Sequence, residues 1–144
     1  MTALIERPIV EVLPPQAYAS KEAVIQAIGE AMVAASAVTP AYVDGMLRKE
    51  IEVNTVVTAE VALPHGTADV RGAVLRNVLV IAPIPAGIEW CRDTTVRLAI
   101  GFAGTRDDAH LRLLASVARV LADAALLERL KAGGDAPNLA ALFV

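Results

Sequence analysis

The 144-residue sequence is poor in the residues on which many functional classes depend. Its one cysteine, Cys91, excludes an internal disulfide framework and a cluster of zinc-binding thiolates. Aromatic side chains make up only 3% of the chain, too few for a platform on which nucleic-acid bases stack. The net charge is −3 and there is no basic run, so we expect no nucleic-acid partner.

The chain also lacks a long apolar run, although 56% of its residues are hydrophobic. The longest run, Val78 to Ile88, contains Pro83, Pro85 and Gly87, and it is shorter than the roughly 20 residues that a membrane-spanning helix needs. Residues 1–10 include charges and lack the apolar region of a secretory signal. We therefore expect a cytoplasmic protein that does not insert into a membrane.

Helical and extended patterns alternate along the chain, which is typical of a single layered α/β domain. Ser20 is a suitable N-cap for a helix over residues 21–37, and Thr39-Pro40 predicts the start of a second helix that ends near Glu50. Extended segments are predicted at Ile51–Leu63, with an interruption allowed, and at Asn77–Ile84 and Thr95–Ala103, with a turn-rich connection at Pro85–Asp93. Helices are predicted at Asp69–Leu75, at Asp123–Lys131 and at Asp135–Phe143, and Asp107 or Asp108 is the predicted cap of a long helix. Residues 1–19 are expected to be a short apolar lead-in without a helix.

His65 follows an extended run and lies between Pro64 and Gly66, so its backbone is not expected to be helical. Gly66 permits a tight turn and a close approach to the backbone, and Thr67 adds a hydroxyl. A histidine displayed in this way suits a nucleophile or a general base. The alternative is a loop histidine that only bonds a neighbouring carbonyl.

His110 lies in the first turn of the predicted long helix, on the same face as Leu113, Leu114 and Val117. The positive field at a helix N-terminus disfavours an imidazolium, so we expect His110 to be neutral and to donate a hydrogen bond. Two histidines of this kind would suit phosphoryl transfer. The alternative is a histidine partly buried in the core.

Other kinds of site have weaker support. No H-x-x-x-H or H-x-H spacing exists, so no metal site is expected, and there is no phosphate-binding glycine loop or nucleophile elbow. Cys91 is interpreted as a bystander in a connecting loop, with a reactive thiol as the alternative.

Five segments together resemble a known family: Tyr42–Leu47, Ala62–Thr67, Gly87–Trp90, Leu98–Ala103 and His110 at a helix start. The sequence resembles the mannitol/fructose-type enzyme IIA (EIIA) domains of the bacterial sugar phosphotransferase system, and the mannitol branch most of all. The resemblance implies one domain over residues 1–144, with a mixed β-sheet of about five strands flanked by helices. It implies a free-standing phosphoryl carrier that needs no metal or organic cofactor.

The resemblance also implies a role for each matching residue. His65 would accept a phosphoryl group on Nε2 from the phosphocarrier protein HPr and pass it to a cysteine on the IIB domain of a sugar permease, with mannitol as the expected sugar. His110 would assist by hydrogen bonding. Lys49 stands where the family usually has an arginine, with Arg48 beside it, and a lysine lacks the planar fork that grips two phosphate oxygens.

The chemistry of transfer adds further expectations. The backbone amides of Gly66 and Thr67 and the Thr67 hydroxyl are candidate donors to the phosphoryl oxygens. An apolar ring for docking of the two partner proteins is expected around His65, and its predicted members are Met46, Leu63, Val70 and Leu75.

Two alternatives to a transport carrier remain. The chain could be a regulatory module that signals its phosphorylation state through protein binding. It could also be a scaffold in which Lys49 has replaced the arginine and transfer is lost.

Overall fold

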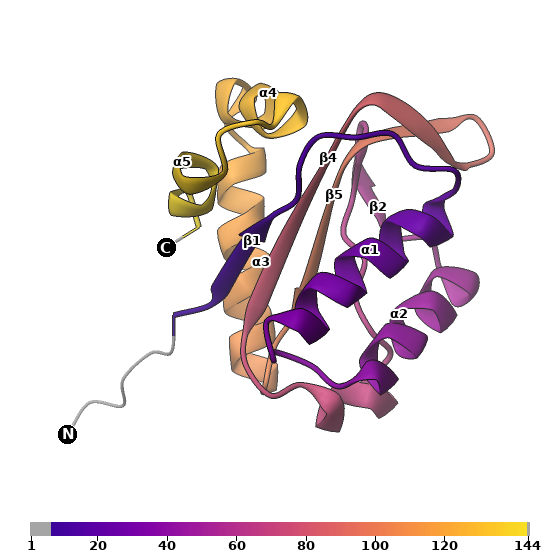
Figure 1. The fold of residues 1–144 in the computed structure, drawn as a ribbon, viewed down its shortest axis with the longest axis vertical. Coiled ribbons are helices and arrows are strands. Elements are labelled where there is room, and N and C mark those ends of the chain that lie inside the picture. Colours follow the sequence, from indigo (N-terminus) through magenta and orange to yellow (C-terminus); the bar gives the residue numbers. More distant parts are fainter. Residues whose placement is uncertain (1–6, 144) are drawn as a thin grey trace.

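The computed structural model describes residues 7–143 and shows a five-stranded mixed β-sheet between two layers of helices (Figure 1). The strands are β1 (Ile9–Val12), β2 (Val56–Thr58), β3 (Val61–Ala62), β4 (Val78–Cys91) and β5 (Thr94–Ala103), in the spatial order β1-β4-β5-β3-β2. β4 and β5 form an antiparallel hairpin, whereas β1 is parallel to β4 and β3 is parallel to β5. The expected α/β fold with about five strands is confirmed.

The helices lie on both faces of this sheet. The helices α1 (Lys21–Ala34) and α2 (Pro40–Glu52) cover one face, and α3 (Asp107–Leu121), α4 (Ala124–Ala132) and α5 (Ala136–Ala141) cover the other (Figure 1). A 3₁₀ helix, η1 (Ala68–Ala73), packs against α2. The Ser20 hydroxyl caps α1 by accepting a hydrogen bond from the Ala23 amide at 3.1 Å, as the sequence predicts.

The capping of two helices differs from the expected pattern. The Thr39 side chain makes no capping hydrogen bond, and Pro40 alone marks the first turn of α2. Arg106 occupies the N-cap position of α3, so Asp107 and Asp108 lie in the first turn instead. Their carboxylates still favour the positive end of the helix, which explains why the sequence pattern suggested a cap.

The core is divided by the sheet into two apolar clusters. Along β4, Val78 and Val80 face the cluster under α1 and α2, while Leu79 and Ile81 face the cluster under α3 to α5. Successive side chains of a strand point to opposite faces, so a strand covered on both sides is apolar at every position. This accounts for the high hydrophobic content of the chain.

The predicted turn-rich connection at Pro85–Asp93 is wrong, because β4 continues to Cys91. The β4–β5 ladder shifts its register between Pro83 and Ile88, so the amide that Pro85 lacks is not needed for regular pairing. Gly87 takes a positive φ of 78° within this irregular stretch. The reversal of the chain needs only Arg92 and Asp93, the latter with a φ of 61°.

Two other segments also depart from the prediction. Residues Ile9–Val12 of the expected lead-in form an edge strand, β1, in register with Val78–Ile81 of β4. The segment Ile51–Leu63 begins as helix, because α2 runs on to Glu52, and the interruption that the sequence allowed is a turn at Glu60 between β2 and β3. Residues 1–6 of the segment assessed for a secretory signal lie outside the described residues.

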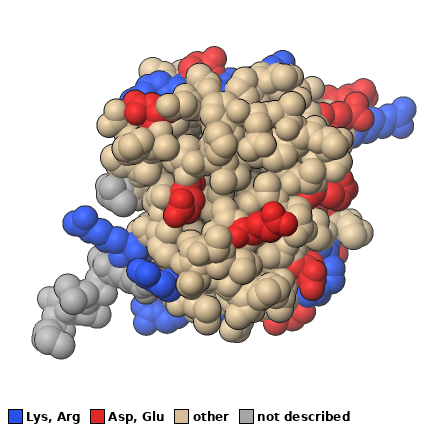
Figure 2. Space-filling model, viewed as in Figure 1, with Lys and Arg blue, Asp and Glu red and all other residues tan. Residues whose placement is uncertain are grey.

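Within residues 7–143, no helix is both long enough and apolar enough to cross a membrane. Uncharged side chains dominate the face shown in Figure 2, where acidic groups lie near the middle and most basic groups at the margin.

Candidate active site

The two histidines meet where β3 and β5 end. Because these strands are parallel, their carboxyl ends lie at the same edge of the sheet. His65 follows β3, and the Phe102 amide on β5 donates to the Pro64 carbonyl at 3.2 Å, which joins the His65 segment to the sheet. The ring centroids of His65 and His110 are 5.9 Å apart. The predicted pairing of the two histidines therefore has the geometry of a shared site.

Phe102 supports both imidazole rings. The residue is 1% exposed, and its ring centroid lies 5.0 Å from that of His65 and 4.9 Å from that of His110. A buried phenyl ring that contacts both histidines limits their movement and excludes water from one side of the site. The sequence analysis did not single out Phe102 as a site residue.

His65 has a defined tautomer. Its Nδ1 lies 2.8 Å from the Leu63 carbonyl oxygen, which can only accept, so Nδ1 carries the proton and Nε2 has the free lone pair. Burial, partly offset by this hydrogen bond, lowers the pKa of His65 below its ordinary value, and the Lys49 cation lowers it further. Both effects keep the ring neutral and its Nε2 available as a nucleophile.

His110 is also held in the neutral form. Burial is the main cause that lowers its pKa, followed by the neighbouring His65 and the Arg71 cation. The predicted neutrality agrees with this direction, but the leading cause is burial rather than the helix N-terminus. A neutral imidazole keeps one N–H for donation to an oxygen beside His65.

Tyr42 connects the two strand ends through its hydroxyl, and the sequence analysis placed it only in a family motif. The hydroxyl donates to the Phe102 carbonyl and accepts from the Gly66 amide, both at 2.9 Å. Burial raises the pKa of Tyr42 to about 12, so the hydroxyl stays protonated. The Gly66 amide, a predicted phosphate donor, is therefore already occupied in this structure.

Gly66 is required for its lack of a side chain rather than for a special turn. The described glycines with positive φ are Gly87, Gly133 and Gly134, so Gly66 is not one of them. A Cβ atom at Gly66 would lie 2.7 Å from Cε1 of Tyr42, closer than packed carbon atoms can approach. The expected close approach is thus made by Tyr42.

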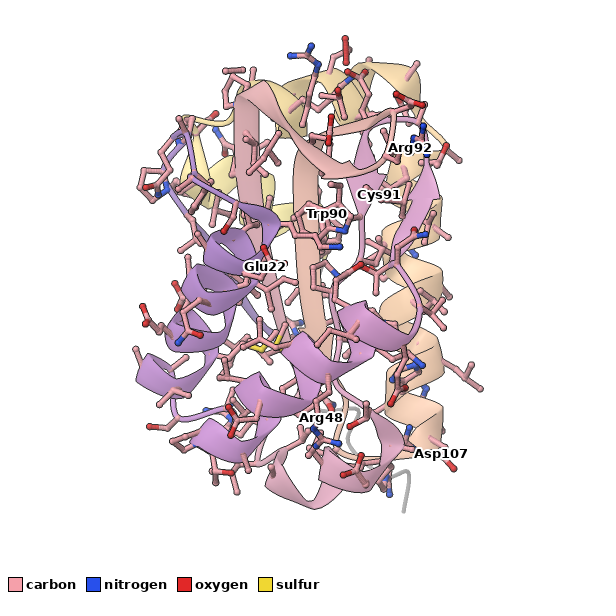
Figure 3. The ribbon with its side chains drawn as sticks, turned by 90° about the vertical axis from the view of Figure 1, so that its right-hand side faces the viewer. Glu22, Arg48, Trp90, Cys91, Arg92 and Asp107 are labelled. Atoms are coloured by element: carbon pink, nitrogen blue, oxygen red, sulfur yellow. The ribbon has the colours of Figure 1, made fainter. Side chains whose placement is uncertain are left out.

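The two predicted cations of α2 have different surroundings. Lys49 is half-buried in the last turn of α2, and its charge acts on His65. Arg48 is exposed and pairs with Asp69 of η1 through atoms 3.1 Å apart, and Figure 3 shows it beside η1. The structure therefore brings Lys49 toward the histidine, while Arg48 joins α2 to η1.

Thr67, the remaining predicted donor, is 9% exposed. Its Oγ1 is buried and has no partner in hydrogen-bonding geometry among the described residues. The hydroxyl is nevertheless near enough to Asp69 to lower the pKa of that carboxyl, together with Arg48. To donate to an incoming oxygen, the Thr67 hydroxyl would have to turn away from Asp69.

Two of the four residues predicted to form the apolar docking ring around His65 are buried. Met46 and Leu63 are 1% and 4% exposed and belong to the core, so neither can contact a partner protein. Val70 is half-buried, and Leu75 is exposed. Leu111, which follows His110, is also exposed and was not predicted. Periodicity does not distinguish a core position from a surface position in so apolar a sequence.

In the part of the chain that the structure describes, no group of three or more His, Cys, Asp or Glu side chains could hold a metal ion. Cys91 is the last residue of β4 and lies at the opposite end of the molecule from Arg48 and Asp107 (Figure 3). It contributes nothing to the histidine site.

These features define an α/β protein with two adjoining histidines at one edge of its sheet. His65 is neutral and tautomer-locked, a second neutral histidine adjoins it, and a cation acts on it. The sequence model of the family described as "Phosphoenolpyruvate-dependent sugar phosphotransferase system, EIIA 2" matches residues 10–143. The chain belongs to this family and is an EIIA-type component of a phosphotransferase system.

Individual relatives agree with the family match. The multiphosphoryl transfer protein of Salmonella typhi is 35% identical over 134 residues, which are 93% of this chain and 35% of that protein. The mannitol-specific phosphotransferase enzyme IIA component of Bacillus subtilis (strain 168) is 30% identical over 128 residues, 89% of each chain. This chain thus spans about a third of the Salmonella and Escherichia coli multiphosphoryl transfer proteins that it matches.

A solved structure shows the same fold. The crystal structure of IIA mannitol from Escherichia coli superimposes with a TM-score of 0.82 at 29% identity, over 93% of this chain and 96% of that one. A complex of enzyme IIA and phosphorylated enzyme IIB for mannitol from Escherichia coli gives a TM-score of 0.83 at 29% identity, over 92% of this chain and 93% of that one.

Proposed function

We propose that the protein carries a phosphoryl group on Nε2 of His65, which it accepts from HPr and passes to a cysteine on the IIB domain of a sugar permease. Mannitol is the proposed sugar, because relatives at 29–30% identity that match most of this chain bear that name. The proposed location is the cytoplasm, where a IIB domain could be reached. The family match over residues 10–143 supports one EIIA domain in this chain.

The observation that carries the proposal is the contact between His65 Nδ1 and the Leu63 carbonyl at 2.8 Å. It directs the lone pair to Nε2, and the lowered pKa keeps that atom unprotonated at neutral pH. A phosphorylated EIIB partner in the related Escherichia coli complex supports the second half of the proposal.

Each transfer exchanges one bond to phosphorus for another. In the first, the bond from Nε2 of His65 to phosphorus forms while the bond from phosphorus to the donor breaks. In the second, a bond from the IIB cysteine sulfur to phosphorus forms while the Nε2–phosphorus bond breaks, which returns the lone pair to His65. Positioned donors and cations stabilise the phosphoryl oxygens during both steps.

We propose that His110, Lys49 and Thr67 are these oxygen-binding groups. His110 adjoins His65 and keeps one N–H, Lys49 supplies positive charge, and the buried Thr67 hydroxyl is a donor that would exchange Asp69 for a phosphoryl oxygen. Arg48 and the Gly66 amide were also predicted to bind phosphate, and each would first have to leave its present partner, Asp69 or Tyr42.

The test is phosphorylation in vitro. The protein is incubated with phosphoenolpyruvate, enzyme I and HPr, and we expect an adduct that acid destroys and base preserves, located on His65. His65→Ala should form none, whereas His110→Ala should accept the group and pass it on more slowly. An adduct that survives His65→Ala, or no adduct on the folded wild type, would overturn the proposal.

A second measurement addresses the acceptor. Phosphorylated protein is mixed with a mannitol permease containing IIB and with mannitol, and we expect mannitol phosphate to appear. If the protein is phosphorylated on His65 but no tested IIB domain removes the group, the transport role is wrong and the regulatory alternative is supported.

A further inference from the structure

A small polar cavity adjoins His110 and the Gly66-Thr67 segment that follows His65. Its volume is about 10 Å³, room for about one water molecule. The residues that line it are Tyr42, Gly66, Thr67, Arg71, Val74, Gly104 and His110. Two of them, Thr67 and His110, are proposed above to bind phosphoryl oxygens. Arg71 adds a guanidinium that nothing in the sequence pattern had suggested.

Close packing of η1 against α2 places Arg71 in this cavity. Val70 fills the space beside two glycines, since a Cβ atom at Gly45 would lie 2.3 Å, and one at Gly66 2.9 Å, from its side chain. The next residue, Arg71, forms an ion pair with Asp107 in the first turn of α3. The guanidinium therefore joins η1 to the helix turn that also carries His110.

The charges at the site are divided between its two histidines. The Lys49 cation lowers the pKa of His65, which burial also lowers. The Arg71 cation acts on His110 and Tyr42 instead. It lowers the pKa of His110 in addition to burial, and it lowers the pKa of Tyr42 against the effect of burial. Arg48 does not line the cavity and is paired with Asp69. Arg71 is thus the guanidinium that the structure brings to the His110 side of the site.

We propose that Arg71 binds the phosphoryl oxygens when His65 is phosphorylated and releases Asp107 to do so. This inference rests on the function proposed above. The Asp107 side chain is 84% exposed, so its pair with Arg71 is weak and easily exchanged. A phosphoryl group brings more negative charge than a carboxylate, and two of its oxygens can bind the planar guanidinium of Arg71. The ammonium of Lys49 cannot bind two oxygens in this bidentate way.

The experiment compares phosphorylated variants with a matched control. Arg71→Gln removes the guanidinium, Arg71→Lys keeps the charge without the fork, and Asp107→Asn removes the competing carboxylate. Arg112→Gln is the control, because Arg112 also pairs with an aspartate in the first turn of α3, Asp108, at 3.8 Å, and does not line the cavity. Thermal melting establishes that each variant is folded.

Two readouts report directly on the phosphoryl group. The first is the equilibrium of phosphoryl exchange with HPr, and the second is the pKa of the bound phosphate, followed by ³¹P NMR. Arg71→Gln should shift the equilibrium toward HPr by about tenfold, the worth of one charge-assisted hydrogen bond, and raise the phosphate pKa. In both readouts Arg71→Lys should lie between the wild type and Arg71→Gln. Asp107→Asn should shift both readouts in the opposite direction to Arg71→Gln.

The outcomes separate this inference from the proposed function. If wild-type protein is phosphorylated on His65 but Arg71→Gln matches Arg112→Gln in both readouts, Arg71 does not bind the phosphoryl group and the inference is wrong. If wild-type protein takes up no phosphoryl group, the proposed function itself fails. A purely structural role for Arg71 would lower the melting temperature but leave the phosphate pKa unmoved.

Discussion

The hydroxyl of Tyr42 accepts a hydrogen bond from the backbone amide of Gly66 at 2.9 Å and donates one to Phe102 at the same distance. Tyr42 lies on α2, Gly66 follows β3, and Phe102 is on β5, so one side chain fixes three elements at the histidine site. His65 is the neighbour of Gly66, and its ring packs on Phe102. The backbone position of His65 therefore depends on the hydroxyl of Tyr42, which comes from a distant segment.

Replacing Tyr42 by phenylalanine should destabilise the protein by about 1–3 kcal/mol, because the Gly66 amide and the Phe102 carbonyl lose a buried partner. We also expect slower phosphorylation of His65, since its backbone becomes less fixed. Urea denaturation and the rate of phosphoryl uptake measure the two effects. Tyr18→Phe is the matched control: the Tyr18 hydroxyl is buried and has no partner in the described residues, so its loss should cost nothing. Equal stabilities for the two variants would contradict the prediction.

A methyl group at Gly66 should be disruptive. In Gly66→Ala the new Cβ would meet Tyr42 Cε1 at 2.7 Å and Cζ at 2.9 Å, so the tyrosine or the loop must move, at a cost of about 1–3 kcal/mol. Gly72→Ala, in η1, places its methyl group where nothing lies within 4 Å, so stability should be unchanged or slightly raised. Chemical denaturation of both variants provides the comparison, and a harmless Gly66→Ala would refute the tight packing.

Glu50 supports the end of α2 from within the core. The residue is 6% exposed, and its carboxylate accepts hydrogen bonds from the Thr55 amide at 3.0 Å, the Thr55 hydroxyl at 2.7 Å and Trp90 Nε1 at 3.1 Å. Glu50→Ala leaves these donors unpaired and should cost about 3 kcal/mol, with a red shift in the emission of Trp90. Glu52→Ala, an exposed neighbour, should change neither stability nor fluorescence. Unchanged emission in Glu50→Ala would show that the Trp90 contact is unimportant.

The histidines should make stability depend on pH. Both have a folded-state pKa below the ordinary 6.5, mainly because of burial, so the unfolded chain binds more protons between the two values. Stability is then full above about pH 6.5 and falls as the pH drops through the window below it. The charged groups that act on this pair are Lys49, Glu50 and Arg71.

The measurement is the free energy of unfolding of the wild type between about pH 8 and about pH 5, compared with that of a variant carrying His65→Asn and His110→Asn. We expect the loss of stability on acidification to be smaller in the variant. An equal loss in both proteins would mean that other groups, such as carboxylates, cause it.

Local sequence signals predicted the elements whose residues and caps act over a few positions. The helices begun by Ser20, Pro40 and Asp123 occur where expected, and the two apolar runs became the central strands. The sequence did not predict the strand β1 or the full length of β4, because prolines in and near them indicated the end of regular structure. Pairing with a neighbouring strand outweighed that local preference, and the irregular register at Pro83–Ile88 accommodated it.

The sequence by itself determined the family, the layered α/β fold and the two histidines, because these depend on residue type and local spacing. Only the tertiary structure decided which other groups share their site. Tyr42 and Phe102 reach it from distant segments, Arg71 is brought there by the packing of η1 on α2, and Met46 and Leu63 are withdrawn into the core. Such contacts arise where elements far apart in the chain meet, so no local pattern records them.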